Sequence, residues 1–262
     1  AELRLCVIAL ALGEPGRARV HLNALTSGLG EDVATWPAQV HLAQATTLLA
    51  AGDEFESVED ALMRYGQALP AGDNAGQATN LINQAVLGVR RGQDQAGRGE
   101  EAKAAKAYRD ARDLLINALG VAGESGDAHA EAHARETLAL THWYLGRTGD
   151  AGEDWRRAGG LYEWYGDVIG QARCEVHQAT TLLIGAERDP ARAARLLRAA
   201  LDRLPSTGLG TALAHLHLAA AEPRDAAIHR EAGLAALAHW DNGPAEPTQI
   251  AVIRHRLSEL PH

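Results

Sequence analysis

The sequence is poor in aromatic residues and in cysteine. Only eleven of its 262 residues are Trp, Tyr or Phe, and two are cysteines. Cys6 and Cys174 lie far apart, each within an apolar helical pattern, so a disulfide framework and a four-cysteine zinc site are both excluded. We expect both thiols to be reduced and buried, as is usual in a cytoplasmic protein.

Membrane-spanning segments, export signals and an excess of positive charge are absent as well. No apolar run reaches the roughly 18 residues of a membrane span, and the first ten residues lack the basic start and cleavage site of a signal peptide. The formal net charge is −9, from 25 basic and 34 acidic residues, which argues against binding to a phosphate backbone. We therefore expect a cytoplasmic protein that contacts neither membranes nor nucleic acid directly.

The common catalytic motifs are missing too. The chain has no phosphate-binding loop, no glycine-rich dinucleotide turn, no nucleophile elbow and no HExxH pattern. We expect no enzymatic activity and no cofactor. Ala1 leads straight into a helical pattern without a capping residue or an initiator methionine, and we expect the chain to be part of a longer protein.

Alanine dominates what is present, with 53 residues. Alanine and leucine are the best helix formers, and no segment alternates apolar and polar residues over the length of a strand. The composition therefore predicts an all-α protein in which small side chains allow helices to approach closely. We expect over about 65% helix and no sheet.

A Gly-Asp pair marks an internal repeat at residues 72–73, 126–127 and 166–167. An alanine stands six residues after each of these glycines, and another stands thirteen residues after it. Seven residues are two helical turns, so both alanines face the same side of a helix. The six alanines are Ala78, Ala85, Ala132, Ala139, Ala172 and Ala179, and Ala38 and Ala45 repeat the spacing without the Gly-Asp pair.

Each such helix is followed by a break and a second amphipathic helix, which predicts helical hairpins. Breakers include Pro15-Gly16, Asp189-Pro190, Pro205-Ser206, a longer flexible turn at 92–100 and the cluster at 241–247. We expect about six antiparallel helix pairs, followed by a terminal helix, in one repeat domain over 1–262. The pairs span 1–28, 37–69, 74–120, 127–164, 167–204 and 206–239, and the terminal helix spans 247–260.

This pattern of glycine, aspartate and paired alanines resembles the tetratricopeptide repeat family, most closely in the third to fifth units. It is similar to the divergent repeats that follow the ATPase module in bacterial regulators of the signal-transduction ATPase class, including antibiotic regulatory proteins. The resemblance implies a right-handed α-solenoid. The second, third, fourth and sixth units depart from the consensus in their loops or length, and none of the host's ATPase or DNA-binding motifs is present.

In the family, the first helices line a concave surface, and ligand contacts fall one and five residues after the first alanine. The resemblance thus implies ligand-binding residues that we expect to be partly exposed. They are Gln39 in the second unit, Thr79 and Asn83 in the third, His133 and Thr137 in the fourth, and Arg173 and His177 in the fifth. Asn83 is the residue type that the family uses to hold a peptide backbone. The alternative is that these positions are only the hydrophilic face of surface helices.

Three other patterns have a structural and a functional interpretation. His129 and His133 stand four apart, with Glu131 or His142 near, but no third metal ligand is fixed by spacing, and we expect no metal site. Arg188, Arg192, Arg195 and Arg198 form a positive stripe, which is either a solvated face or a docking site for an acidic partner. Six aromatic residues between Trp143 and Tyr165 form either a core or a binding patch.

These features favour a non-catalytic scaffold, within a larger bacterial regulator, that binds a peptide, a protein segment or another domain of its own chain. Oligomers are compatible with this hypothesis. The alternative is a sensor of a small molecule or a metal, in which His133, Arg173 and His177 contact an anionic effector.

Overall fold

The computed structural model describes residues 1–11, 14–30, 32–185, 188–238 and 248–261. Of these residues, 83% are helical, and no strand occurs among them, which confirms the all-α fold class. The contacts divide the chain into two compact units, Ala1–Ala130 and Glu131–His262, and each unit is described by itself. The single repeat domain over 1–262 stays a prediction.

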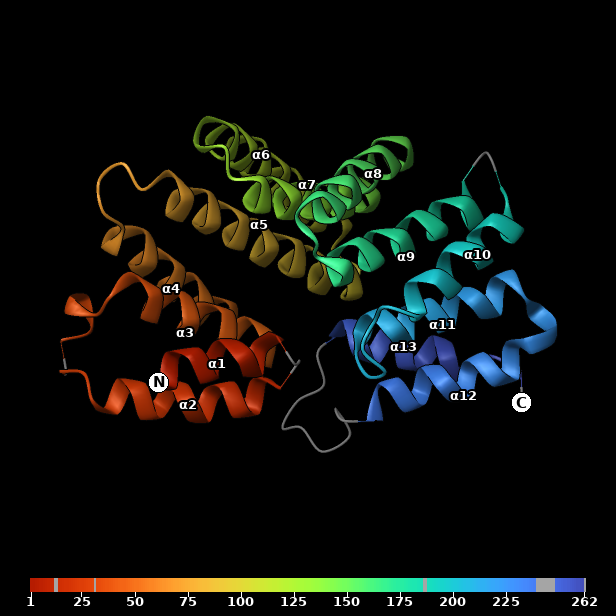
Figure 1. The fold of residues 1–262 in the computed structure, drawn as a ribbon, viewed down its shortest axis with the longest axis horizontal. Helices are drawn as coiled ribbons and strands as arrows, with labels where there is room; N and C mark the ends of the chain where they lie inside the picture. The colour runs from red at the N-terminus through yellow and green to blue at the C-terminus, as the bar shows by residue number, and fades with distance from the viewer. Residues whose placement is uncertain (12–13, 31, 186–187, 239–247, 262) are drawn as a thin grey trace. The chain divides into compact units, whose positions relative to one another are not determined.

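The first unit contains three consecutive helix pairs. Within each pair the two helices pack on one another. The pairs are connected by the packing of α2 on α3 and of α4 on α5 (Figure 1). The elements are α1 (Glu2–Ala11), α2 (Pro15–Ser27), the short η1 (Val33–Thr35), α3 (Ala38–Ala51), α4 (Phe55–Ala68), α5 (Asn74–Gly97) and α6 (Glu101–Ser125).

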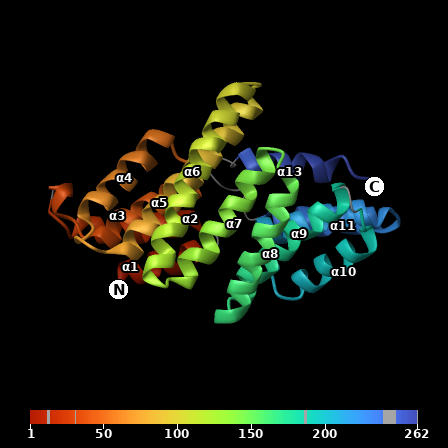
Figure 2. The ribbon, with the colours of Figure 1, turned by 90° about the horizontal axis from the view of Figure 1, so that it is seen from above.

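The second unit continues the succession of helices. Helix α9 contacts α8, α10 and α11 (Figure 2). Helix α11 packs on both α12 and α13. The elements are α7 (Ala128–Tyr144), whose first residues belong to the first unit, α8 (Thr148–Tyr165), α9 (Val168–Ile184), α10 (Pro190–Leu201), α11 (Leu209–Ala221), η2 (Pro223–Asp225), α12 (Ala226–Ala236) and α13 (Thr248–Ser258).

The described helices begin and end within about five residues of the bounds expected for the pairs; α6 ends at Ser125 where residue 120 was expected, and residues 239 and 247 lie outside the described part of the chain. Packing in consecutive pairs is consistent with an α-solenoid. The antiparallel order and the right-handed sense remain predictions. One expectation was wrong: the stretch 92–100 is no extended turn, because α5 continues to Gly97.

A physical reason for the Gly-Asp repeat lies in the helix ends. Gly72, Gly126 and Gly166 have φ values of 81°, 66° and 83°, in the left-handed region that favours glycine. Gly126 and Gly166 terminate α6 and α8 in this conformation. The aspartate that follows then caps the next helix: Asp167 accepts a 2.8 Å hydrogen bond from the Gly170 N–H. Asp73 and Asp127 accept equivalent bonds of 2.9 Å from Gly76 and Ala130.

The alanine stripe lies where helices meet. All six alanines that follow the three Gly-Asp pairs have 0% exposure, as the spacing predicted. Ala45, in the copy that lacks the Gly-Asp pair, has 1% exposure. In the second unit, Ala132 and Ala139 pack with Trp155 and Tyr162, which are also buried. The small residues of α7 and α9 thus make room for the few large aromatic side chains of α8.

A glycine permits similar close packing in the first unit. A β-carbon at Gly92 of α5 would lie 2.4 Å from the Tyr108 ring of α6, which is closer than real β-carbon contacts. Gly92 and Tyr108 are therefore a matched pair that brings α5 and α6 together.

The two cysteines are free and buried, as expected. Burial raises the pKa of the Cys174 thiol, and the nearby Glu136 carboxylate raises it further, so the thiol stays protonated. Among the helices of the described residues, none is long and apolar enough to cross a membrane.

Candidate functional site

The seven residues implied by the resemblance lie on four helices. Gln39 is exposed on α3, Thr79 and Asn83 are half-buried on α5, and the other four lie in the second unit on α7 and α9.

On α5, Thr79 and Asn83 bond to their own helix. The Thr79 hydroxyl donates to the Ala75 carbonyl at 2.9 Å, and Asn83 Nδ2 donates to the Thr79 carbonyl, also at 2.9 Å. Each bond joins a side chain to the backbone one turn earlier. One of the two N–H bonds that Asn83 could give to a peptide is thus already used.

Thr137 is not partly exposed, and this expectation was wrong. Its exposure is 7%, and its hydroxyl donates to the His133 carbonyl at 3.0 Å. The Thr141 hydroxyl donates in turn to the Thr137 carbonyl at 2.8 Å. Thr137 lies on the packed side of α7, next to the buried Leu138, and serves the core of the unit.

Arg173 is bound to a carboxylate that the sequence analysis did not select. Its Nε and NH2 atoms donate to the two oxygens of Glu136 at 2.9 Å each, in a bidentate ion pair between α9 and α7. The Tyr162 hydroxyl donates to the same carboxylate at 2.6 Å, and the guanidinium lies over the Tyr162 ring. Glu136 is thus a hub for three helices.

The electrostatics of this cluster follow from burial and pairing. Burial alone would raise the pKa of Glu136, but hydrogen bonds and charge from Arg173, with smaller effects of His133 and Tyr162, lower it to about 2. Burial and the Glu136 carboxylate raise the pKa of Tyr162, which therefore stays protonated. The charge of Arg173 is balanced internally.

His177 packs against an aromatic ring. Its imidazole stacks on the Trp155 indole with ring centres 4.9 Å apart and an angle of 11° between the planes. Burial lowers the pKa of His177 to about 4, since the opposing effect of the Glu136 carboxylate is smaller and the Arg173 charge lowers the pKa further. The ring is neutral at pH 7 and contributes to packing.

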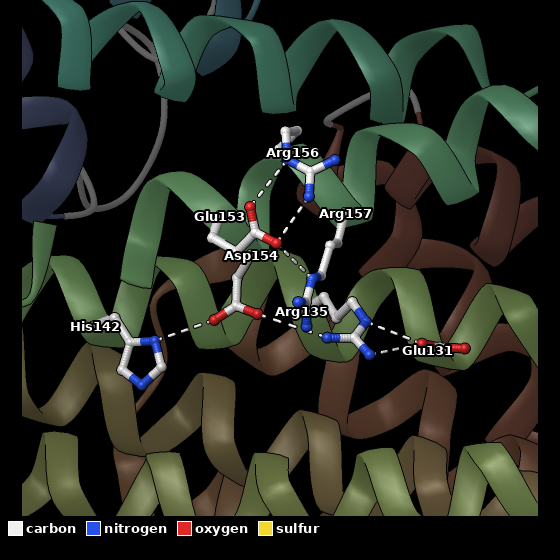
Figure 3. A network of polar contacts seen from close by, with 7 residues as sticks. All are labelled: Glu131, Arg135, His142, Glu153, Asp154, Arg156 and Arg157. Carbon is white, nitrogen blue, oxygen red and sulfur yellow. Dashed lines mark hydrogen bonds and ion pairs between the residues drawn. The ribbon is translucent and has the colours of Figure 1, made fainter. Parts of the chain in front are cut away.

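Two of the candidate metal ligands of α7, Glu131 and His142, belong to a second polar network (Figure 3). Glu131 accepts a 2.9 Å hydrogen bond from Arg135 Nε, and His142 Nδ1 lies 3.1 Å from Asp154 Oδ2. Arg135 also reaches Asp154 at 3.6 Å, so the network fastens α7 to α8. No group of three His, Cys, Asp or Glu side chains within the described residues is placed to hold a metal ion.

The arginine stripe and the aromatic cluster differ in their surroundings. Arg188, Arg192 and Arg195 are exposed, and Arg198 pairs with Glu222. Trp155 and Tyr162 are core residues, whereas Trp164 is 77% exposed. The core interpretation of the aromatic cluster therefore holds for its centre and not for Trp164.

A groove in the first unit is a stronger candidate for a binding site. It has a volume of about 610 Å³, within the usual range of ligand sites, and we call it the α5 groove. Helix α5 forms its floor and helices α4 and α6 form its walls. The lining residues are Glu59, Met63, Gly66 and Gln67 of α4, Asn80, Gln84, Leu87, Gly88 and Arg91 of α5, and Ala107, Asp110, Ala111 and Leu114 of α6.

The floor of the α5 groove is a row of amides and small residues. Asn80, Gln84 and Gly88 follow one another at intervals of four, so they lie on one face of α5. A β-carbon at Gly66 would lie 2.6 Å from Asn80 Nδ2, and the glycine thus leaves space for this amide. Asn80 Oδ1 is buried and accepts no hydrogen bond from the described residues.

The walls combine apolar surface with paired charges. Met63 is 53% exposed although its side chain is apolar. Glu59 pairs with Arg91 at 3.0 Å, and the Arg91 guanidinium lies over the Phe55 ring. Asp110 pairs with Lys106 at 2.6 Å, so every charged residue that lines the groove has a partner.

Comparison with known proteins adds no family assignment. No protein-family model matches the chain, and no curated protein matches it at a significant level. The tetratricopeptide resemblance therefore rests on the repeat pattern alone.

Sequence analysis missed both Glu136 and the α5 groove. The four-residue spacing of Asn80, Gln84 and Gly88 was an available signal for the groove floor. It also missed a further copy of the alanine spacing, because Ala214 and Ala221 stand six and thirteen residues after Gly208 without an aspartate. Ala214 has 0% exposure, like the stripe alanines of the other units.

Proposed function

We propose that this chain is a non-catalytic binding module and that its α5 groove holds a peptide segment of a partner protein. The observation that carries the proposal is the shape and chemistry of the groove floor. From Asn80 to Arg91 the floor extends about 16 Å along α5, at roughly 1.5 Å per residue. About five residues of an extended peptide span this length.

The lining residues suit such an occupant. The side-chain amides of Gln67, Asn80 and Gln84 both donate and accept hydrogen bonds, as a peptide backbone requires. Met63 and Leu114 offer apolar contacts on opposite walls, and methionine adapts to varied side chains. The exposed carboxylates of Glu59 and Asp110 favour a neutral or basic segment over an acidic one.

The wider role follows the resemblance to tetratricopeptide repeats. We propose a right-handed solenoid that serves as the interaction or sensory region of a larger cytoplasmic bacterial regulator. Peptide binding would shift this regulator between states. The bound segment could belong to another domain of the same protein, and oligomers are compatible with this role.

The anionic effector of the sensor alternative has less support from the residues expected to contact it. An anionic effector needs a cation with free hydrogen-bonding capacity, but Arg173 gives two bonds to Glu136. His177 is stacked on Trp155. These residues stabilise contacts between helices and offer little to a ligand.

The experiment is selection of peptides from a phage-displayed library of random 12-residue sequences on the purified chain. Selected peptides are then labelled, and their affinities for variants are measured by fluorescence anisotropy. Met63→Ala and Gln84→Ala should each weaken binding about 3- to 10-fold, the range expected for losing one contact of about 1 kcal/mol.

Matched controls lie on α6 outside the groove. Ile116 is 54% exposed, almost the same as Met63, and Asn117 is an exposed amide. Ile116→Ala and Asn117→Ala should leave affinity unchanged within about twofold. Equal losses in the control and groove variants, or loss only in Arg192→Ala, would place the binding surface elsewhere.

A further inference from the structure

Two histidine rings of the second unit face each other between α11 and α12. The Nδ1 atoms of His215 and His229 are 3.4 Å apart, and their ring centres are 5.6 Å apart. This separation exceeds that of a good hydrogen bond, for which donor and acceptor lie about 2.7–3.2 Å apart. Burial lowers the pKa of His215 and the neighbouring His229 lowers it further, so the His215 ring is neutral at pH 7.

A carboxylate lies on the far side of the second ring, near its outer nitrogen. His229 Nε2 lies 3.5 Å from Glu222 Oε2, and Arg198 NH2 donates to the same oxygen at 2.7 Å. When Nε2 of a neutral His229 carries the proton toward Glu222, Nδ1 presents its lone pair to His215. A carboxylate on the outer nitrogen is the usual companion of a metal-binding histidine.

We infer that His215 and His229 bind a divalent transition metal ion, such as Zn²⁺ or Ni²⁺, between their Nδ1 atoms. Two nitrogens about 2.0–2.1 Å from a tetrahedral zinc ion are about 3.3–3.4 Å apart, which matches the observed separation. The described residues supply no third His, Cys, Asp or Glu ligand at this place, so water completes the coordination. The ion links α11 to α12, and this inference is independent of the peptide groove.

The test is isothermal titration of tag-free protein with ZnCl₂ and with NiCl₂ at pH 7.5. We expect saturable binding that His215→Ala and His229→Ala each reduce by more than tenfold. Glu222→Gln keeps both ligands but removes the carboxylate, and it should weaken binding about tenfold. The control is the double variant His129→Ala/His133→Ala, which removes a histidine pair with helical four-residue spacing and should leave the site intact.

A measurement on the unmodified protein covers variants that fail to fold. Long-range ¹H–¹⁵N spectra of the imidazoles, recorded with and without zinc, report which nitrogens bind metal. The expected result is a shift of Nδ1 in His215 and His229. Zinc that shifts only His129 and His133, or binding that survives in a folded His215→Ala protein, would overturn the inference.

Discussion

Glu136→Gln tests the hub of the second unit, because the replacement keeps the shape of the side chain and removes its charge. In the folded protein the Glu136 pKa is about 2, against 4.5 for an unperturbed glutamate. The Glu136 side chain is 14% exposed and that of Arg173 is 40% exposed, so solvent screens the pair in part and the free energy derived from the pKa is an upper value. Lowering the pKa from 4.5 to about 2 corresponds to at most about 3 kcal/mol of folding free energy at neutral pH.

The sign follows from the lowered pKa. A carboxylate with a depressed folded-state pKa stabilises the protein above pH 4.5, and this contribution is lost as the pH falls toward 2. Between pH 7 and pH 3 the native protein should lose about 2 kcal/mol through Glu136 alone. The Gln variant should be less stable at pH 7 and should lack this component of the pH dependence.

The assay is urea unfolding at pH 7 and pH 3, followed by circular dichroism, together with a ¹³C titration of the Glu136 carboxyl. Glu153 is the matched control, because hydrogen bonds from Arg156 hold its pKa at about 2 although its side chain is 42% exposed. Glu153→Gln should change stability far less, since solvent screens exposed pairs. A Glu136 titration near pH 4.5, or equal effects of the two variants, would refute the reasoning.

Two further predictions concern helix ends and helix packing. Asp167→Ala removes the acceptor for the Gly170 N–H at the start of α9 and should cost about 1 kcal/mol in thermal or urea unfolding, whereas Asp167→Asn should cost less. Ala139→Trp inserts a large ring where exposure is 0% and should cost about 1–3 kcal/mol or more, while the same change at the exposed Ala220 should leave the melting temperature nearly unchanged. An unaltered melting temperature in Ala139→Trp would contradict the placement of the repeated alanines where helices meet.

The helix ends and the buried stripe could be predicted from the sequence because both depend on local chemistry. Asp189 and Pro190 illustrate this, since the side chain accepts from the Arg192 N–H and proline occupies the first turn of α10, as their order in the sequence indicated. The sequence does not show which polar residue of a helix faces a groove. Asn80 and Asn83 lie on the same α5 helix, and only Asn80 lines the groove between α4 and α6.

Contacts between helices could not be predicted from the sequence either, because they depend on how the helices pack. Glu136 and Arg173 are 37 residues apart, and their pairing depends on how α9 lies against α7. The family resemblance implied that Arg173 contacts a ligand but gave no information on the carboxylate that faces it. The same limit applies to His215 and His229, which meet only after α11 and α12 have packed.

The Gly-Asp pairs also allow a whole repeat to be deleted or added between two identical dipeptides. Gly126 and Gly166 stand 40 residues apart in the same left-handed conformation, each followed by an aspartate that starts a new helix. A deletion of residues 127–166 would join Gly126 to Asp167 and restore an identical dipeptide at the junction. Unequal recombination at such sites changes the number of hairpins without creating a new turn, so the length of an array like this one can vary in whole units.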